Sequence, residues 1–135
     1  MTCFDKIVYQ SPKAPAAIGP YSIAAGGGPF VFSAGQIAID PVTGDLVSGG
    51  IEQQTHQVFS NLKAVLEASS SCLEKVVKTT VYLQDMKDFA AMNKVYGEYF
   101  TSQPPARTTV AVAGLPKNAL IEIEVIALLC KEGDC

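Results

Sequence analysis

The spacing of hydrophobic residues predicts two helices separated by strand-like segments. Between residues 51 and 66 the apolar positions recur every three or four residues, and a run of serines follows. Residues 89–100 show the same helical period. Segments rich in β-branched and aromatic residues, bounded by glycine and proline, predict strands. These strands are expected at residues 6–9, 22–25, 29–39, 76–83, 107–112 and 120–129.

This order of elements, β-β-β-α-β-α-β-β, indicates an α+β fold. Each helix joins two strands, so right-handed crossovers place both helices on one face of a single mixed sheet. The 135 residues fit one domain that spans residues 1–135. The second face of the sheet must then be solvated or covered by something else.

Composition changes this picture in one respect. Hydrophobic residues make up 48% of the chain and charged residues only 17%, which favours a subunit that buries surface in a homo-oligomer. A net charge of −3 without clustered Lys and Arg disfavours a nucleic-acid partner. The apolar runs are too short to span a bilayer, and the first residues resemble neither a signal peptide nor a mitochondrial presequence. We therefore expect no membrane association and a cytoplasmic location.

The four cysteines offer no metal-ligand spacing. Cys3, Cys72, Cys130 and Cys135 form no C-x-x-C pair, and His56 is the only histidine. We expect four reduced thiols with structural or incidental roles, and no metal site. His56 is expected at the boundary of the first helix rather than in catalysis.

An arginine is the candidate for specific chemistry. Arg107 directly follows Pro104-Pro105-Ala106, and two prolines stiffen the chain just before a strand. In the last strand, Glu122 and Glu124 share one face. If the last two strands form a hairpin, Arg107 lies near this acidic face. The residues allow either a structural salt bridge or a site where Arg107 binds an anion and a glutamate activates water.

Three further residues each have more than one interpretation. Gly35 interrupts a strand, which indicates a bulge or the close approach of another group. Tyr21 follows Gly19-Pro20 and either projects from the loop or packs on the core. Asn93 borders the apolar face of the second helix, where a buried amide needs hydrogen-bond partners from its own fold, a neighbouring subunit or a ligand.

Several motifs, in this order and spacing, resemble the RidA (YjgF/YER057c/L-PSP) family of enamine/imine deaminases. The similarity extends from about Pro15 to Leu128. The motifs are Ala16-Ala17-Ile18-Gly19-Pro20-Tyr21, Gly35-Gln36-Ile37, Asp40-Pro41-x-x-Gly44, Val77-Lys78-Thr79-Thr80-Val81, Pro105-Ala106-Arg107, Leu115-Pro116-Lys117 and Ile121-Glu122-Ile123-Glu124.

The resemblance implies a chorismate-mutase-like fold that forms a homotrimer with sites between subunits. It implies hydrolysis of 2-iminopropanoate and 2-iminobutanoate to 2-keto acids and ammonia, without metal or cofactor. Arg107 is then expected to bind the substrate carboxylate and Glu122 to assist the attacking water. The expected lining residues are Tyr21, Asn93, Thr109 and Gly35. A cationic Arg107 beside Glu122 is expected to keep this carboxylate ionised.

Two positions depart from the family pattern. Ala34 stands where many relatives have Ser, and Ser33, one position earlier, is expected to face the other side of the strand. Thr109 stands where relatives often carry Cys. These departures leave open a regulatory trimer that binds small anions without turnover. A third alternative, endoribonuclease or translation-inhibitor activity, is disfavoured by the acidic charge and the single histidine.

Overall fold

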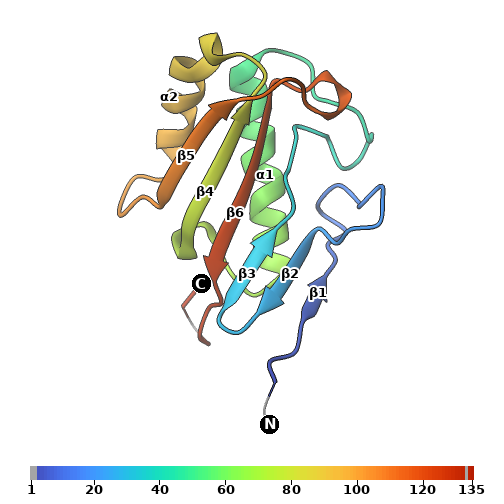
Figure 1. Ribbon diagram of the computed structural model, residues 1–135, viewed down its shortest axis with the longest axis vertical. Coiled ribbons are helices and arrows are strands. Elements are labelled where there is room, and N and C mark those ends of the chain that lie inside the picture. Colours follow the sequence, from blue (N-terminus) through green and yellow to red (C-terminus); the bar gives the residue numbers. More distant parts are fainter. Residues whose placement is uncertain (1–2, 133) are drawn as a thin grey trace.

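The computed structural model describes residues 3–132 and 134–135 and contains one six-stranded sheet (Figure 1). Its strand order is β1-β2-β3-β6-β4-β5. The strands are β1 (Ile7–Tyr9), β2 (Ala24–Gly27), β3 (Phe30–Ser33), β4 (Val76–Leu83), β5 (Ala106–Ala111) and β6 (Ile121–Leu128). All neighbours pair antiparallel except β4 and β5, which are parallel. The prediction of a single mixed sheet is confirmed.

Two helices, α1 (Ile51–Ala68) and α2 (Phe89–Tyr99), lie on the same face of this sheet (Figure 1). Three short 3-10 helices complete the secondary structure of the described residues: η1 (Leu73–Lys75), η2 (Met86–Asp88) and η3 (Pro116–Asn118). The element order matches the sequence prediction. The last two strands, β5 and β6, do not form the hairpin that the sequence analysis considered, because β4 lies between them and pairs with both.

The core fills the space between the helices and the sheet. The largest buried side chains come from α1, α2, β3, β4 and β6. Each of these elements buries one face, so its apolar residues recur with the helical or the strand period. Aromatic rings close the gap between the helices: the Phe59 ring stacks on Tyr99 at 4.2 Å between centroids and meets Tyr96 edge-on at 5.7 Å. The α1 stripe predicted from sequence is therefore the core-facing side of that helix.

The strand predicted at residues 29–39 ends early, at Ser33. Beyond it the chain leaves the sheet and keeps one bridge to it, between Gln36 and Ile123, while Ile39 forms a bridge with Leu46. The buried Asn61 amide of α1 donates to the carbonyls of Ile37 and Ile39, at 3.2 and 2.9 Å. A side chain thus satisfies backbone groups that a neighbouring strand would otherwise pair. This long-range contact could not be read from the local sequence pattern.

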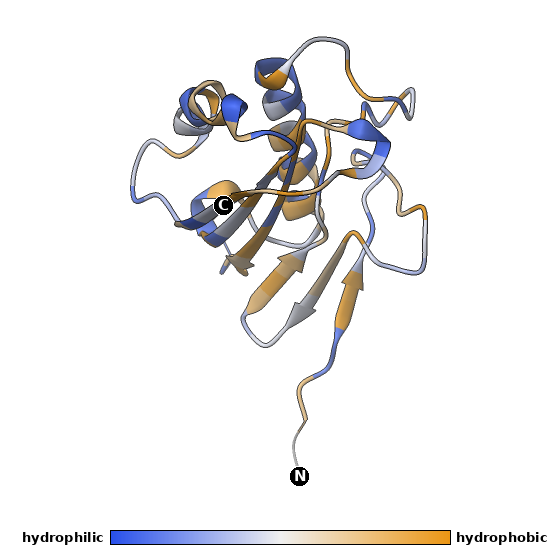
Figure 2. Ribbon diagram, turned by 45° about the horizontal axis from the view of Figure 1, so that its top comes forward, coloured by the Kyte–Doolittle hydropathy of each residue, from blue (hydrophilic) through white to orange (hydrophobic). Residues whose placement is uncertain are grey.

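The sheet face opposite the helices is uncovered within the chain and carries exposed apolar side chains. Phe32 is 45% exposed, Phe30 and Val110 are also exposed, and Val8 on β1 is 55% exposed. Figure 2 shows hydrophobic residues along the edge strand β1 and along β3. Exposed apolar groups gathered on one face are typical of an interaction surface. In the described chain, no helix is both long enough and apolar enough to cross a membrane.

Three of the four cysteines lie close together, which their spacing along the chain did not predict. The Sγ atoms of Cys72, Cys130 and Cys135 all lie within 4.8 Å of one another, whereas the exposed Cys3 is free. Cys72 precedes β4 and Cys130 follows β6, and because these strands are antiparallel, the beginning of one lies beside the end of the other. Spacing along the sequence could not reveal this proximity.

Candidate active site

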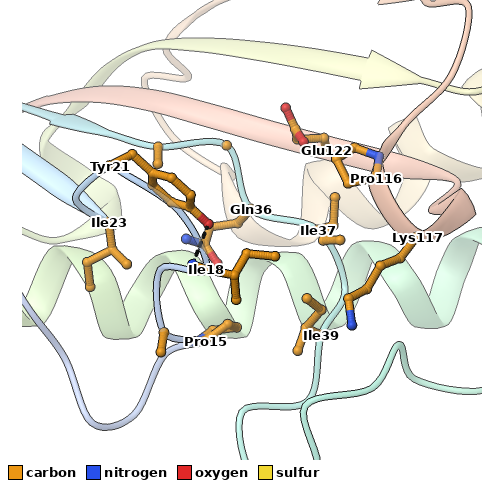
Figure 3. A pocket seen from close by; sticks show the side chains of 13 residues that line it. Pro15, Ile18, Tyr21, Ile23, Gln36, Ile37, Ile39, Pro116, Lys117 and Glu122 are labelled. Atoms are coloured by element: carbon orange, nitrogen blue, oxygen red, sulfur yellow. Dashed lines mark hydrogen bonds between the residues drawn. The ribbon is translucent and has the colours of Figure 1, made fainter.

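A cleft of about 390 Å³ lies where the loop before β2, the segment after β3 and the start of β6 meet (Figure 3). Its wall is mainly apolar, with Tyr21, Gln36, Lys117 and Glu122 as the residues with polar side chains. The residues lining it are Pro15, Ala16, Ile18, Tyr21, Ile23, Ala34, Gly35, Gln36, Ile37, Ile39, Pro116, Lys117 and Glu122. Such a cleft suits a small ligand that is partly apolar and partly charged.

Glu122 is the carboxylate of this cleft. Its neighbours in β6, Ile121 and Ile123, are fully buried against the helices, so strand alternation directs Glu122 to the other face. Partial burial raises the pKa of the Glu122 carboxyl, and the nearby Glu124 raises it further. Glu124 itself accepts a hydrogen bond from the Tyr82 hydroxyl of β4. A carboxyl with a raised pKa is better suited to accept and return a proton near neutral pH.

Gly35 is the close neighbour of Glu122. A Cβ atom at position 35 would lie 2.4 Å from Glu122 Oε2 and 2.6 Å from its Cδ. This glycine therefore serves the approach of a side chain, one of the two interpretations that the sequence left open. The glutamate occupies the space that any other residue at position 35 would fill.

Tyr21 projects from its loop rather than packing into the core. It is 50% exposed, and its hydroxyl accepts a hydrogen bond from the Ile18 backbone N–H at 3.3 Å, shown as a dashed line in Figure 3. The loop containing Tyr21 is stiffened by three prolines, and Tyr21 N also bonds the Gly19 carbonyl at 2.8 Å. The ring thus forms one wall of the cleft that contains Glu122.

The cleft has no hydroxyl group at position 34, because this residue is alanine. Ala34 lines it, whereas Ser33 is buried and its Oγ accepts a hydrogen bond from Val125 N at 2.9 Å. The Ser33 hydroxyl therefore already has a partner in the sheet, and the prediction that it does not replace a hydroxyl at position 34 is confirmed.

Lys117 lines the cleft, although the sequence analysis did not predict it as a site residue. Its Nζ donates a hydrogen bond to the Gly44 carbonyl at 3.4 Å.

Arg107 lies in a second cluster, at the start of β5. Its Nη1 donates to Asn93 Oδ1 of α2 at 2.8 Å. Its guanidinium carbon lies 4.6 Å from the ring centroid of Tyr96 and 5.6 Å from that of Phe89. The flat guanidinium is therefore held by two aromatic rings and one amide. Asn93, whose partners the sequence left open, is a positioning partner of Arg107.

Thr109 stands on the same face of β5 as Arg107, two residues further along. Its Oγ1 is buried and has no hydrogen-bond partner among the described residues. Buried hydroxyls are nearly always satisfied in folded proteins, so the partner of this one is water, a ligand or another subunit.

The predicted site residues therefore fall into two groups on opposite faces of the sheet. Along β4, Arg107 is in register with Thr79, whose hydroxyl bonds Tyr96 on the helix side, whereas Glu122 is in register with Tyr82 on the open side. The two residues are also separated by roughly 10 Å along the strands and roughly 10 Å across them. The expectation that Arg107 lies beside Glu122 is wrong within one chain. Accordingly the pKa of Glu122 is raised, not held low by an arginine.

Comparison with known proteins shows the family to which the chain belongs. The family described as Endoribonuclease L-PSP matches residues 11–129. A RutC family protein of Pyrococcus horikoshii is 57% identical over 122 residues, which cover 90% of this chain and 97% of the relative. Reactive Intermediate Deaminase A, a chloroplastic protein of Arabidopsis thaliana, is 48% identical over 124 residues, covering 92% of this chain and 66% of that longer protein.

The fold is shared with solved structures. The crystal structure of Escherichia coli TdcF with bound serine matches with a TM-score of 0.87 and 35% identity, covering 92% of this chain and 99% of the other. A single mixed sheet with two helices on one face is thus a RidA-like fold. The chain belongs to the RidA (L-PSP) family.

Proposed function

We propose that the protein hydrolyses reactive 2-imino acids, including 2-iminopropanoate and 2-iminobutanoate, to 2-keto acids and ammonia. The active site is completed between two copies of the chain in a homotrimer. One copy contributes Arg107 with Asn93 and Thr109, and its neighbour contributes Glu122 with Tyr21 and Gly35.

The single observation that supports this proposal best is the separation of two complementary half-sites. One half has a fixed cation and an unpaired buried hydroxyl, and the other has a carboxylate of raised pKa in an apolar cleft. Neither half can perform the hydrolysis alone. The exposed apolar face formed around Phe30, Phe32 and Val110 is a surface on which a neighbouring copy can dock.

The relatives support the chemistry. One of them is named a reactive intermediate deaminase, and a solved relative was crystallised with bound serine. Serine carries the same carboxylate and neighbouring nitrogen as a 2-imino acid. A ligand of this size fits a cleft of about 390 Å³ whose isoleucines can pack against a short alkyl chain.

The mechanism follows from the two groups. Arg107 binds the substrate carboxylate through two parallel hydrogen bonds, which fixes the orientation of the imine carbon. Glu122 accepts a proton from water as the water oxygen bonds to that carbon. The C–N bond of the resulting carbinolamine then breaks, with the proton passing to nitrogen. One iminium ion and one water thus yield one keto acid and one ammonium ion.

A coupled assay tests the proposal. A pyridoxal-phosphate-dependent threonine dehydratase generates 2-iminobutanoate in situ, and its decay is followed with and without the protein. We expect the wild-type protein to accelerate the decay, and Arg107→Ala and Glu122→Gln to reduce that acceleration at least about 100-fold. Equal decay with wild-type protein and Arg107→Ala would refute the proposal. Tight binding of a keto acid without turnover would instead support a regulatory, non-catalytic trimer.

A further inference from the structure

Three cysteine sulfurs converge at the end of β6 that lies farthest from Glu122. Cys72 precedes η1, Cys130 follows β6, and Cys135 belongs to the segment beyond it. The three Sγ atoms all lie within 4.8 Å of one another, and those of Cys72 and Cys130 are 3.9 Å apart. The proposed hydrolysis uses none of them. The family match ends at residue 129, so Cys130 and Cys135 lie outside the part of the chain that the family shares.

Local hydrogen bonds and one ion pair hold these cysteines in place. Cys130 N donates to the Ser70 carbonyl at 2.8 Å, and the Ser71 hydroxyl donates to the Leu128 carbonyl at 2.7 Å. The segment beyond β6 is tied back by the ion pair between Lys75 Nζ and Asp134 Oδ2, at 3.5 Å. The arrangement thus joins the loop before β4 to the chain after β6.

The cluster is accessible from solvent. Cys72 and Cys130 are half-buried and Cys135 is exposed. All three line a hollow of about 500 Å³, whose charged members are Lys63, Glu67 and Glu74. A ligand can therefore reach the sulfurs, and the two half-buried thiols can shield it from part of the solvent.

A single disulfide joins only two sulfurs, so it would leave the third thiol of this cluster unbonded. A metal ion can bind all three at once. With metal–sulfur bonds of about 2.3 Å, neighbouring sulfurs lie roughly 3.8–4.0 Å apart. The Cys72–Cys130 separation has this value, and the sulfur of the exposed Cys135, which lies closer to both, moves outward to reach it.

We propose that Cys72, Cys130 and Cys135 form a three-thiolate site for a soft metal ion, Cu(I). Thiolates select soft ions. Among the described residues, no His, Asp or Glu joins the three sulfurs within ligand distance. Structural zinc sites are almost always four-coordinate, so a set of three sulfurs suits Cu(I) better than Zn(II). Each thiol releases its proton to solvent as it binds the metal, and no change of oxidation state is needed.

The test is an anaerobic titration of the reduced, full-length protein with Cu(I) held by the chromogenic chelator bicinchoninate. We expect the wild-type protein to withdraw one Cu(I) per chain and to develop ultraviolet sulfur-to-copper absorption. Cys135→Ser is the key variant, because this residue is exposed and its loss leaves the core intact. It is expected to weaken Cu(I) binding at least about tenfold, since even the loss of an outer-shell partner typically costs about 10- to 100-fold.

Three controls make the outcome decisive. Cys3→Ser must bind Cu(I) like the wild type, because Cys3 lies outside the cluster. Cys72→Ser and Cys130→Ser must lose binding while retaining the wild-type circular dichroism spectrum. Absence of stoichiometric Cu(I) uptake, equal uptake by Cys135→Ser and wild type, or retention of Zn(II) with exclusion of Cu(I) would each overturn the assignment. Imine hydrolysis by Cys135→Ser should be unchanged, which separates this test from that of the proposed function.

Discussion

Replacing Gly35 with alanine tests whether the position of Glu122 determines activity. The new Cβ atom would lie 2.4, 2.6 and 2.9 Å from Glu122 Oε2, Cδ and Cγ, all inside van der Waals contact. The glutamate must move by an ångström or more, because it is the flexible partner. Misplacing a reacting group by about 1 Å can cost about 100-fold in rate. We therefore expect kcat/KM for 2-iminobutanoate to fall about 100-fold.

Stability should change little in the same variant. Gly35 is not in the left-handed region, so alanine fits its backbone, and loss of chain entropy in the unfolded state offsets part of the clash. We expect the free energy of unfolding to shift by less than about 1 kcal/mol, measured by urea denaturation. Gly27→Ala is the matched control, since a Cβ there meets no atom within 4 Å.

The coupled imine assay shows whether a loss of activity comes from the displaced Glu122 side chain or from a general change in packing. Adding Gly35→Ala to Glu122→Gln should cause no further loss, because both changes remove the same carboxylate function. Wild-type kcat/KM in Gly35→Ala, despite the displaced side chain, would refute the reasoning. An equal loss in Gly27→Ala would point to a general effect on the fold.

Three further predictions concern the other groups. Arg107→Lys keeps the charge but loses the planar contact with Tyr96 and the paired hydrogen bonds; we expect KM to rise about tenfold or more, and an unchanged KM in steady-state kinetics would argue against carboxylate binding here. Burial raises the pKa of Glu122, so kcat/KM should fall as the pH drops through that raised pKa and the carboxyl becomes protonated, and a pH–rate profile should lose this acid limb in Glu122→Gln. Asn61→Ala leaves the Ile39 carbonyl without a donor and the Ile37 carbonyl with only the Ile39 N–H. It should lower the free energy of unfolding by about 2 kcal/mol, as measured by urea denaturation; a change near zero would show that the segment after β3 does not depend on it.

The sequence predicted the elements well wherever one face of an element is buried. The bounds of β4 matched at both ends, and α1 began at the expected residue, because buried faces impose strict periods on strands and helices. Residues 34–39 do not form the predicted strand, because the carbonyls of Ile37 and Ile39 accept hydrogen bonds from Asn61, far away in sequence. The early end of β3 depends on that tertiary contact.

The site was predicted in its residues but not in its geometry. Strand alternation correctly put Glu122 and Glu124 on one face and Arg107 with Thr109 on one face. It could not say whether those faces coincide, because that depends on β4 inserting between β5 and β6. The same insertion brings Cys72 and Cys130 together, and spacing rules for metal ligands do not detect such a pair.

The central claim, that each active site combines two chains, has a direct test by subunit mixing. Arg107→Ala and Glu122→Gln proteins are each expected to be inactive. When they are unfolded together in equal amounts and refolded, about one quarter of the sites should pair an intact Arg107 with an intact Glu122 from the neighbouring subunit. The mixture should then recover about one quarter of the wild-type imine hydrolysis. A mixture that forms hybrid trimers but stays as inactive as its two components would contradict the account.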